Sequence, residues 1–388
     1  MDKQHPSQYL YIGMDIHKDN HTAVATDCFN QTFFELEIAN QIPDFKKLIS
    51  KVETLTKAKG LIPVFALEDS YGNGEYLAHY LASQGFLVKE VNPVLVCRER
   101  GLMTHPEKSD LQDAKGVVRA SIREGIDRLP SYSITNVREI AKDLSCLVSD
   151  RNFAVKEQTR LKNQLHYLLN RSYCSHYQEF FQNPFTKKAL RFWTDFPSLS
   201  VFKSSKKRVN KPNWIKSISP QDLSIISEVE AKQIRRKAQR LLVLQAEIKE
   251  LDQEIRHIYF KTGQQLHTLP GCGLNIASRI LAEIKDINRF PSANQLAKYA
   301  GLTPRANESG KRKRKIKDPR GNRKLNHAFY KIVLSQLGRA GTPEAKTFIK
   351  RKLAEGKSKR QAIRSLKRHL CNIIYSMVKE QRAYYQTN

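Results

Sequence analysis

The chain has 388 residues, enough for two or three domains, and its formal net charge is +29. So large a positive excess implies a polyanionic partner, with nucleic acid as the first candidate and a membrane surface as the alternative. No apolar run approaches the roughly 20 residues of a membrane-spanning helix, and the polar first eight residues do not form a signal peptide. The six cysteines form no CxxC pair, so neither zinc nor a disulfide framework is expected, and a reducing cytoplasm fits.

The first 125 residues alternate between strand-like and helix-like segments. Strands are expected at 9–15, 22–26, 32–38, 61–67 and 86–91, and helices at 45–58, 75–84 and 111–122. Strands that alternate with helices predict an α/β domain whose sheet is parallel in part.

Four acids stand at the ends of expected strands or at the start of an expected helix: Asp15, Glu68, Asp110 and Asp113. The last two are three residues apart, so their carboxylates share one helical face. Four carboxylates in one small cleft would repel each other, and a divalent cation removes that conflict. Mg²⁺ prefers carboxylate oxygens, and Mn²⁺ is an alternative. Two such ions are typical of phosphodiester chemistry, although any one of these acids alone would be an ordinary turn or cap residue.

Other polar residues near these acids have two interpretations each. His17 lies either near the metal or exposed in a turn, and Asn92 at a strand end could help to position the site. Arg98, Arg100 and Lys108 precede Asp110 in an expected loop, where they either contact phosphates or simply face solvent.

Two long helices are expected further along the chain, at 137–170 and 228–260. The second has a near-regular heptad seam of Leu, Ile and Ile at 241, 248 and 255. The first has a seam that Arg151 and Gln158 interrupt. An antiparallel pair within one chain and a coiled coil between chains both fit, and we favour assembly between chains.

The stretch 171–227 combines aromatic residues with a basic linker at 203–216. Aromatic side chains interleaved with cations suit single-stranded nucleic acid or RNA. A compact helical subdomain with a solvated loop is the equal alternative for the aromatic residues.

The last third of the chain combines a tight glycine turn with dense positive charge. Residues 269–273 predict a turn before a helix, as in a helix-hairpin-helix element, with N–H groups that could bind a phosphate. Residues 309–324 contain nine Lys or Arg, and residues 346–368 contain ten more, largely on a helix. Ser309, at the start of the first basic stretch, is predicted to lie in a flexible segment bounded by glycine. The residues expected to contact nucleic acid are Gly271, Gly273, Arg305, Lys311, Arg312, Lys313, Arg314, Lys315, Arg320, Arg323 and Lys324.

Two sets of motifs in the same order resemble the insertion-sequence 110 family of transposases, which shares its layout with Piv-type DNA invertases. The four acids resemble the RuvC-like branch of the ribonuclease H-like fold. The later motifs are Leu269-Pro270-Gly271-Cys272-Gly273, Phe290-Pro291-Ser292, Tyr299-Ala300-Gly301-Leu302-Thr303-Pro304-Arg305, Ser309-Gly310 and Arg320-Gly321-Asn322-Arg323.

The resemblance implies a fold class of α/β plus α in three domains. These are a RuvC-like catalytic domain at 1–130, long coiled-coil helices at 131–262 with the insertion at 171–227, and a helical transposase domain at 263–388. By the same resemblance, the four acids bind metal and Ser309 is the nucleophile that forms a covalent phosphoserine–DNA intermediate. A serine hydroxyl needs a base, a metal or a dense positive field to react, and Arg312, Arg314 and Lys315 could supply that field.

The resemblance also implies the partners, which are donor and target DNA, a structured guide RNA, and further copies of the chain in a dimer or tetramer. No membrane partner is expected, and the expected location is the bacterial cytoplasm, at the nucleoid. Three alternatives stay open: a Piv-like invertase without guide RNA, a RuvC-like metal-dependent junction nuclease, and a non-catalytic nucleic-acid-binding protein.

Overall fold

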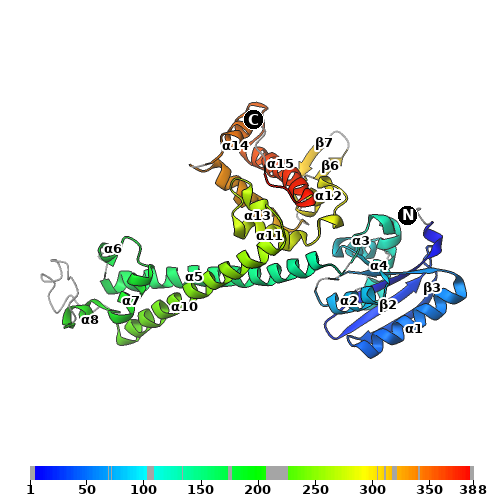
Figure 1. The fold of residues 1–388 in the computed structure, drawn as a ribbon, viewed down its shortest axis with the longest axis horizontal. Helices are drawn as coiled ribbons and strands as arrows, with labels where there is room; N and C mark the ends of the chain where they lie inside the picture. The colour runs from blue at the N-terminus through cyan, green and yellow to red at the C-terminus, as the bar shows by residue number, and fades with distance from the viewer. Residues whose placement is uncertain are drawn as a thin grey trace. The chain divides into compact units, whose positions relative to one another are not determined.

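We analysed the fold in a computed structural model (Figure 1). The structure describes residues 5–68, 70, 72–102, 109–132, 134–173, 177–206, 226–303, 305–309, 312–316, 321–339 and 341–384. Backbone contacts divide the chain into two compact units. One comprises residues 1–139 and 284–380, and the other comprises residues 140–283 and 381–388.

A five-stranded mixed sheet forms the centre of the N-terminal part. Its strands are β1 Tyr9–Ile16, β2 Asn20–Thr26, β3 Thr32–Ala39, β4 Ile62–Leu67 and β5 Leu87–Glu90. They lie in the order β3-β2-β1-β4-β5. The first three pair antiparallel, whereas β4 is parallel to β1 and β5 is parallel to β4. The expected α/β class is confirmed, and β1 lies at the centre of the sheet.

The helices of this part are α1 Ile42–Lys59, α2 Glu75–Ser83, α3 Pro93–Gly101 and α4 Asp110–Glu124. Side chains of β1, α1 and α2, such as Leu10, Phe45 and Leu77, are fully buried in one core. The helix α3 corrects our expectation of a basic loop before Asp110. Asn92 explains it, because its side chain accepts a hydrogen bond of 2.9 Å from Val94 N and caps the helix, with Pro93 in the first turn.

Two long helices, α5 Asn136–Tyr173 and α10 Glu228–Lys261, pair with each other inside the chain (Figure 1). Arg171 Nη1 lies 2.9 Å from Glu230 Oε1, and Arg151 Nε lies 2.5 Å from Asp252 Oδ1. The late part of α5 therefore faces the early part of α10, so the pair is antiparallel. Leu241 of the heptad seam is buried in the core that the two helices share. The structure thus supports the internal pairing that we had ranked second.

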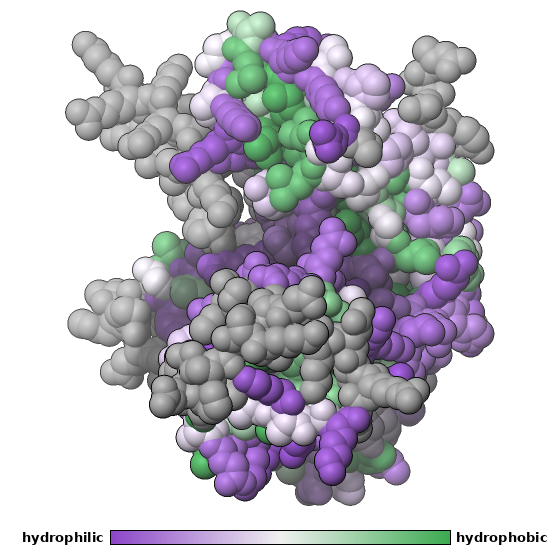
Figure 2. Space-filling model, turned by 90° about the vertical axis from the view of Figure 1, so that its left-hand side faces the viewer, coloured by the Kyte–Doolittle hydropathy of each residue, from purple (hydrophilic) through white to green (hydrophobic). Residues whose placement is uncertain are grey.

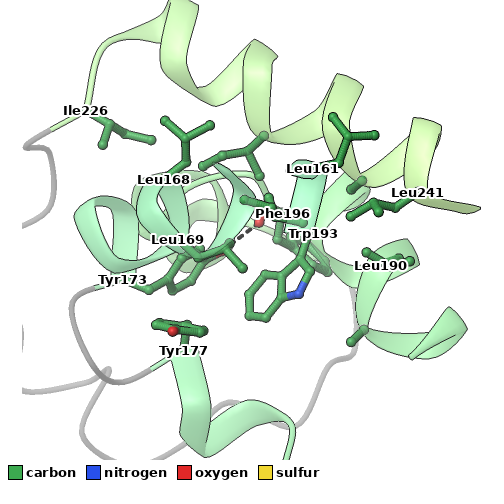
Figure 3. Packing of buried hydrophobic residues seen from close by; sticks show 14 of the residues in the cluster. Leu161, Leu168, Leu169, Tyr173, Tyr177, Leu190, Trp193, Phe196, Ile226 and Leu241 are labelled. Carbon is green, nitrogen blue, oxygen red and sulfur yellow. Dashed lines mark hydrogen bonds between the residues drawn. The ribbon is translucent and has the colours of Figure 1, made fainter. Parts of the chain in front are cut away.

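The aromatic residues of the insertion form a hydrophobic core (Figure 3). Three short helices carry several of them: α6 Tyr177–Phe180, α7 Lys187–Asp195 and α8 Leu199–Ser204. Trp193 and Phe202 are fully buried. The Tyr173 hydroxyl donates a 2.7 Å hydrogen bond to the Phe196 carbonyl, which fixes the end of α5 to this core. These aromatic residues have a packing role, while residues 207–216 of the basic linker lie outside the described residues.

The C-terminal third is mainly helical. Its elements are α11 Leu274–Ile284, α12 Ala293–Tyr299, β6 Arg305–Ser309, β7 Arg312–Ile316, α13 Arg323–Leu337, α14 Pro343–Ala354 and α15 Lys359–Glu380. Short 3-10 helices occur along the whole chain, at Pro6–Gln8, Ile126–Arg128, Leu266–Thr268 and Ile287–Arg289.

The predicted fold class, α/β plus α, is confirmed. The basic residues of 346–368 occupy two helices, because Gly356 takes a positive φ of 77° and ends the first.

Among the coloured residues in Figure 2, hydrophilic ones are widespread, and a hydrophobic strip runs over the upper part of that face. In the part of the chain that the structure describes, every helix is too short or too polar to span a lipid bilayer.

Candidate active site

Three of the four expected acids meet where β1 and α4 cross. Asp15 is the penultimate residue of β1 and is buried, with 7% of its surface exposed. Asp110 and Asp113 lie in the first turn of α4, which Ser109 caps by accepting a 3.2 Å hydrogen bond from Gln112 N. Asp113 is as buried as Asp15, whereas Asp110 is exposed. The site therefore has two sheltered carboxylates and one at its open edge.

Gly13 allows α4 to lie this close to the strand. A Cβ atom at Gly13 would lie 2.5 Å from the Ala114 carbonyl oxygen and 2.5 Å from Val118 Cγ2. Real Cβ atoms do not approach a backbone oxygen so closely, so any side chain here would displace the helix. The glycine in the Gly13-Met14-Asp15 motif thus serves to bring the acids of α4 to Asp15.

Glu68 follows β4 directly, at the same edge of the sheet where β1 ends. In the parallel pairing of β1 with β4, the register ends where Met14 stands opposite Leu67, and Asp15 and Glu68 are the residues that follow these two partners. Neighbouring strands lie about 4.8 Å apart, so the main chains at these two strand ends are close to each other. Glu68 is half-buried. All four acids are therefore placed at or next to one edge of the sheet.

His17 bridges two of the acids. Its Nε2 lies 3.1 Å from Asp15 Oδ2 and 3.2 Å from Asp110 Oδ1. One ligand atom from each of these three residues falls in a group whose members lie within 4.8 Å of one another. Carboxylate oxygens with one imidazole nitrogen fit a divalent cation. The residues present therefore fit the metal that four clustered acids led us to expect.

The site disfavours a bare negative charge. Burial raises the pKa of Asp15, and the Asp113 and Asp110 carboxylates raise it further, against the opposing effect of His17. Partial burial acts to lower the pKa of His17, but the carboxylates of Asp15 and Asp110 outweigh it, so the net direction is upward. A positive charge is stabilised here and an additional negative charge is not.

Asp113 has its own cationic partner. Arg100 Nη2, on α3, lies 2.5 Å from Asp113 Oδ1, and the Arg100 side chain is 23% exposed. Glu99, the residue before Arg100, is buried and its Oε1 pairs with Arg123 Nη1 of α4 at 2.6 Å. These two ion pairs join α3 to α4 and hold the charged end of α4 in place. Arg100 therefore lies on a helix with its side chain largely sheltered from solvent. The sequence had instead predicted a basic loop exposed to solvent.

Ser309 is the last residue of β6, in a two-stranded antiparallel ribbon where it stands opposite Arg312 of β7. This differs from the flexible segment that we expected. The backbones of Gly301 and Gly321 are in contact at the base of the ribbon, and a Cβ atom at Gly321 would overlap Gly301. Gly301 also has a φ of 63°, which favours glycine.

Asparagines fix the base of this ribbon. Asn322 N donates to the Tyr299 carbonyl at 2.7 Å, and its side chain accepts from Leu325 N at 2.9 Å to cap α13. Asn326 Nδ2 donates to the carbonyls of Ala300 at 2.8 Å and Gly301 at 3.2 Å. Lys367 Nζ donates to Asn326 Oδ1 at 2.8 Å, which joins α15 to the same network. Sequence reasoning missed Asn326, and the only signal for Asn322 was its place in the Arg320-Gly321-Asn322-Arg323 motif.

The expected nucleic-acid contacts are described to different extents. Gly271 has a φ of 80° in the turn before α11, and Gly273 accepts from Ile276 N at 2.9 Å. Arg323 and Lys324 are exposed at the start of α13. For β6 and β7 only the backbone is described, which places Arg305, Arg312, Lys313, Arg314 and Lys315 on the ribbon. Lys311 and Arg320 lie outside the described residues.

Family comparisons assign the chain to the transposases, the enzymes that move insertion sequences in DNA. A transposase model of the DEDD type, named for IS110, matches residues 12–174, and the model described as "Transposase IS116/IS110/IS902 family" matches residues 263–350. The first match contains the four acids and the second contains Ser309. The chain belongs to the IS116/IS110/IS902 family of transposases and is a DNA-processing enzyme.

Relatives of similar length agree with this assignment. The "Insertion element IS116 uncharacterized 44.8 kDa protein" of Streptomyces clavuligerus is 25% identical, over 97% of this chain and 96% of that protein. The "Pilin gene-inverting protein" of Moraxella bovis is 25% identical, over 96% of this chain and 97% of that protein.

The solved structure "T. thermophilus RuvC in complex with Holliday junction substrate" aligns with 32% of this chain and 99% of that chain, at 11% identity and a TM-score of 0.25.

Proposed function

We propose that this transposase cleaves and rejoins DNA with a metal-dependent acid cluster and a serine nucleophile. The observation that carries the proposal is the meeting of Asp15, Asp110 and Asp113 where β1 and α4 cross, with His17 bridging two of them. Asp15, Glu68, Asp110 and Asp113 are the proposed ligands of one or two Mg²⁺ or Mn²⁺ ions. When bound, such ions stabilise the negative charge that develops on a phosphate during displacement.

Ser309 is the proposed nucleophile. Its Oγ forms an ester bond to the DNA phosphorus, the bond from phosphorus to the departing strand breaks, and the hydroxyl proton is lost as the departing oxygen gains one. The basic residues that share the ribbon, among them Arg312 on the paired strand, would stabilise the attacking oxygen and the phosphate. The resulting phosphoserine–DNA ester conserves the energy of the broken bond, so a second strand can later replace the serine.

The charge of +29 suits a protein that holds more than one nucleic acid. We propose that the glycine turn before α11, the ribbon and the start of α13 each contact donor or target DNA. By its resemblance to the family, the enzyme would select its sites with a structured guide RNA and act as a dimer or tetramer at the nucleoid. Because α5 and α10 bury their seam against each other, contacts between copies would use other surfaces of these helices or other parts of the chain.

The Ser309→Ala variant gives the sharpest test of this proposal, with the exposed residue Ser335 as the matched control. Each variant is incubated with Mn²⁺ and a labelled DNA substrate, and the products are separated under denaturing conditions. We expect a protein–DNA adduct with the wild type and with Ser335→Ala, and neither adduct nor cleavage with Ser309→Ala. Cleavage that continues in Ser309→Ala would instead identify a metal-dependent nuclease in which water attacks.

The match to a pilin gene-inverting protein over nearly its full length favours a second candidate, a DNA invertase that needs no guide RNA. Purification of the enzyme followed by sequencing of its bound RNA separates the two. A single defined RNA that is required for cleavage supports the guided enzyme. Full activity after ribonuclease treatment supports the invertase.

A further inference from the structure

His17 has a more specific place in the site than a neighbouring turn residue would need. We infer that its Nε2 is a direct protein ligand of the divalent cation, alongside Asp15 and Asp110. The inference rests on the proposed metal site and adds a nitrogen ligand to its four carboxylates. As a ligand, His17 would help to determine which divalent cation the enzyme binds.

The distances match an octahedral site. Two ligand atoms at right angles, each about 2.1 Å from an ion, lie about 3.0 Å from each other. His17 Nε2 lies 3.1 Å from Asp15 Oδ2 and 3.2 Å from Asp110 Oδ1. The imidazole nitrogen therefore already stands at the spacing that neighbouring ligands of one ion adopt.

The hydrogen-bonding chemistry of the ring points the same way. A single Nε2 carries at most one proton, so it cannot make a full hydrogen bond to both carboxylate oxygens at once. Nearly equal distances to the two acceptors leave that proton shared between them. A cation among the three atoms would instead accept an electron pair from each of them.

The backbone holds His17 in position before any ion arrives. His17 follows Ile16, the last residue of β1, and its N–H donates to the Asn20 carbonyl at 3.2 Å. Asn40 fixes the same turn, since its N–H donates to the Asp19 carbonyl at 2.8 Å and its Nδ2 donates to the Lys18 carbonyl at 3.1 Å. Positions 15 and 17 are two residues apart on an extended chain, so both side chains leave the same face.

The consequence of a nitrogen ligand is a change in metal preference. Carboxylate and water ligands suit Mg²⁺, whereas imidazole nitrogen suits transition metals and raises their affinity more than that of Mg²⁺. The His17 side chain is 52% exposed, so its replacement removes little packing. Its loss should therefore weaken Mn²⁺ binding more than Mg²⁺ binding while the fold persists.

Titration calorimetry of the full-length protein with MnCl₂ and MgCl₂ measures this difference. The variants are His17→Ala, Asp15→Asn, and the control His79→Ala, an exposed histidine on α2. We expect His17→Ala to weaken Mn²⁺ binding roughly 10- to 100-fold, with a smaller change for Mg²⁺. His79→Ala should bind as the wild type does, and Asp15→Asn should lose most of its affinity for both ions.

Pulsed electron paramagnetic resonance of the Mn²⁺-loaded protein supplies a direct signature. A ¹⁴N coupling from a bound imidazole should be present in the wild type and in His79→Ala and absent from His17→Ala. Equal or tighter Mn²⁺ binding by His17→Ala would overturn the inference, and tighter binding would show that His17 is only a cationic counter-ion. A wild type that binds neither ion would instead overturn the proposed metal site itself.

Discussion

The acid cluster and the ribbon that carries Ser309 are supported in different ways. Asp15 lies on the central strand of a five-stranded sheet, with a helix packed directly against that strand through Gly13. Ser309 lies at the end of a two-stranded ribbon that is tied down where Gly301 meets Gly321. A lone two-stranded ribbon is marginally stable, whereas a buried strand is among the last elements to open.

The two sites should therefore be sensitive to different kinds of substitution. The acids depend on close packing between a strand and a helix, so a single added methyl group should disturb them. The serine depends on a few hydrogen bonds at the base of the ribbon, so it should respond to their removal. Metal binding at the acid cluster and adduct formation at Ser309 should therefore be lost independently of each other.

The largest effect is expected at Asp15. Asp15→Asn keeps the size of the side chain but removes the charge that would hold a cation, so strand cleavage should fall by a factor of about 10³ or more. DNA affinity should stay within about twofold, because the basic segments supply it. Single-turnover cleavage assays and salt titrations of binding measure the two quantities. Cleavage by the wild type that survives thorough chelation would contradict the metal requirement.

A smaller but specific effect is expected at Gly13. In Gly13→Ala the new methyl group meets the Ala114 carbonyl oxygen, and displacing α4 should lower the free energy of unfolding by about 1–3 kcal/mol. The first turn of α4 carries Asp110 and Asp113, so Mn²⁺ affinity should fall as well. Gly101→Ala is the control, because a Cβ atom there meets nothing within 4 Å. Equal stability of the two variants would show that α4 moves aside without cost.

The sequence predicted the acids of the cluster because their positions follow from local pattern. Apolar runs that end in Asp15 and Glu68 mark strand ends, and the three-residue spacing of Asp110 and Asp113 marks one face of a helix. The parallel pairing of β1 with β4 brings the two strand ends that precede Asp15 and Glu68 to one edge of the sheet.

The parts that the sequence did not predict depend on partners far along the chain. Arg151 was an interruption of the α5 seam until the structure paired it with Asp252, which is 101 residues away. A heptad seam shows that a helix needs a partner, but Leu241 cannot indicate whether that partner is α5 or another copy. Arg100 became a partner of Asp113 only because Asn92 caps a helix that the periodicity had not indicated.

The smallest effect, and the one that best separates the two halves, is expected at Asn326. Asn326→Ala removes two hydrogen bonds to the carbonyls of Ala300 and Gly301 and one from Lys367, with a net cost of about 1–2 kcal/mol. Because these bonds fix the base of the ribbon, a less well-positioned Ser309 should form the adduct about tenfold more slowly, which corresponds to a barrier higher by about 1.4 kcal/mol.

Mn²⁺ affinity at the acid cluster should not change in Asn326→Ala, since the hydrogen bonds of the Asn326 side chain go to Ala300, Gly301 and Lys367. The exposed Asn288 gives a matched control, and Asn288→Ala should form adduct at the wild-type rate. The decisive quantity is the loss of Mn²⁺ affinity in Asn326→Ala relative to the loss in the rate of adduct formation. A variant that lost metal affinity in proportion to adduct formation would show that ribbon and acid cluster form one coupled unit. A slow adduct beside unchanged metal binding would show that the chain positions its nucleophile and its cation by separate means.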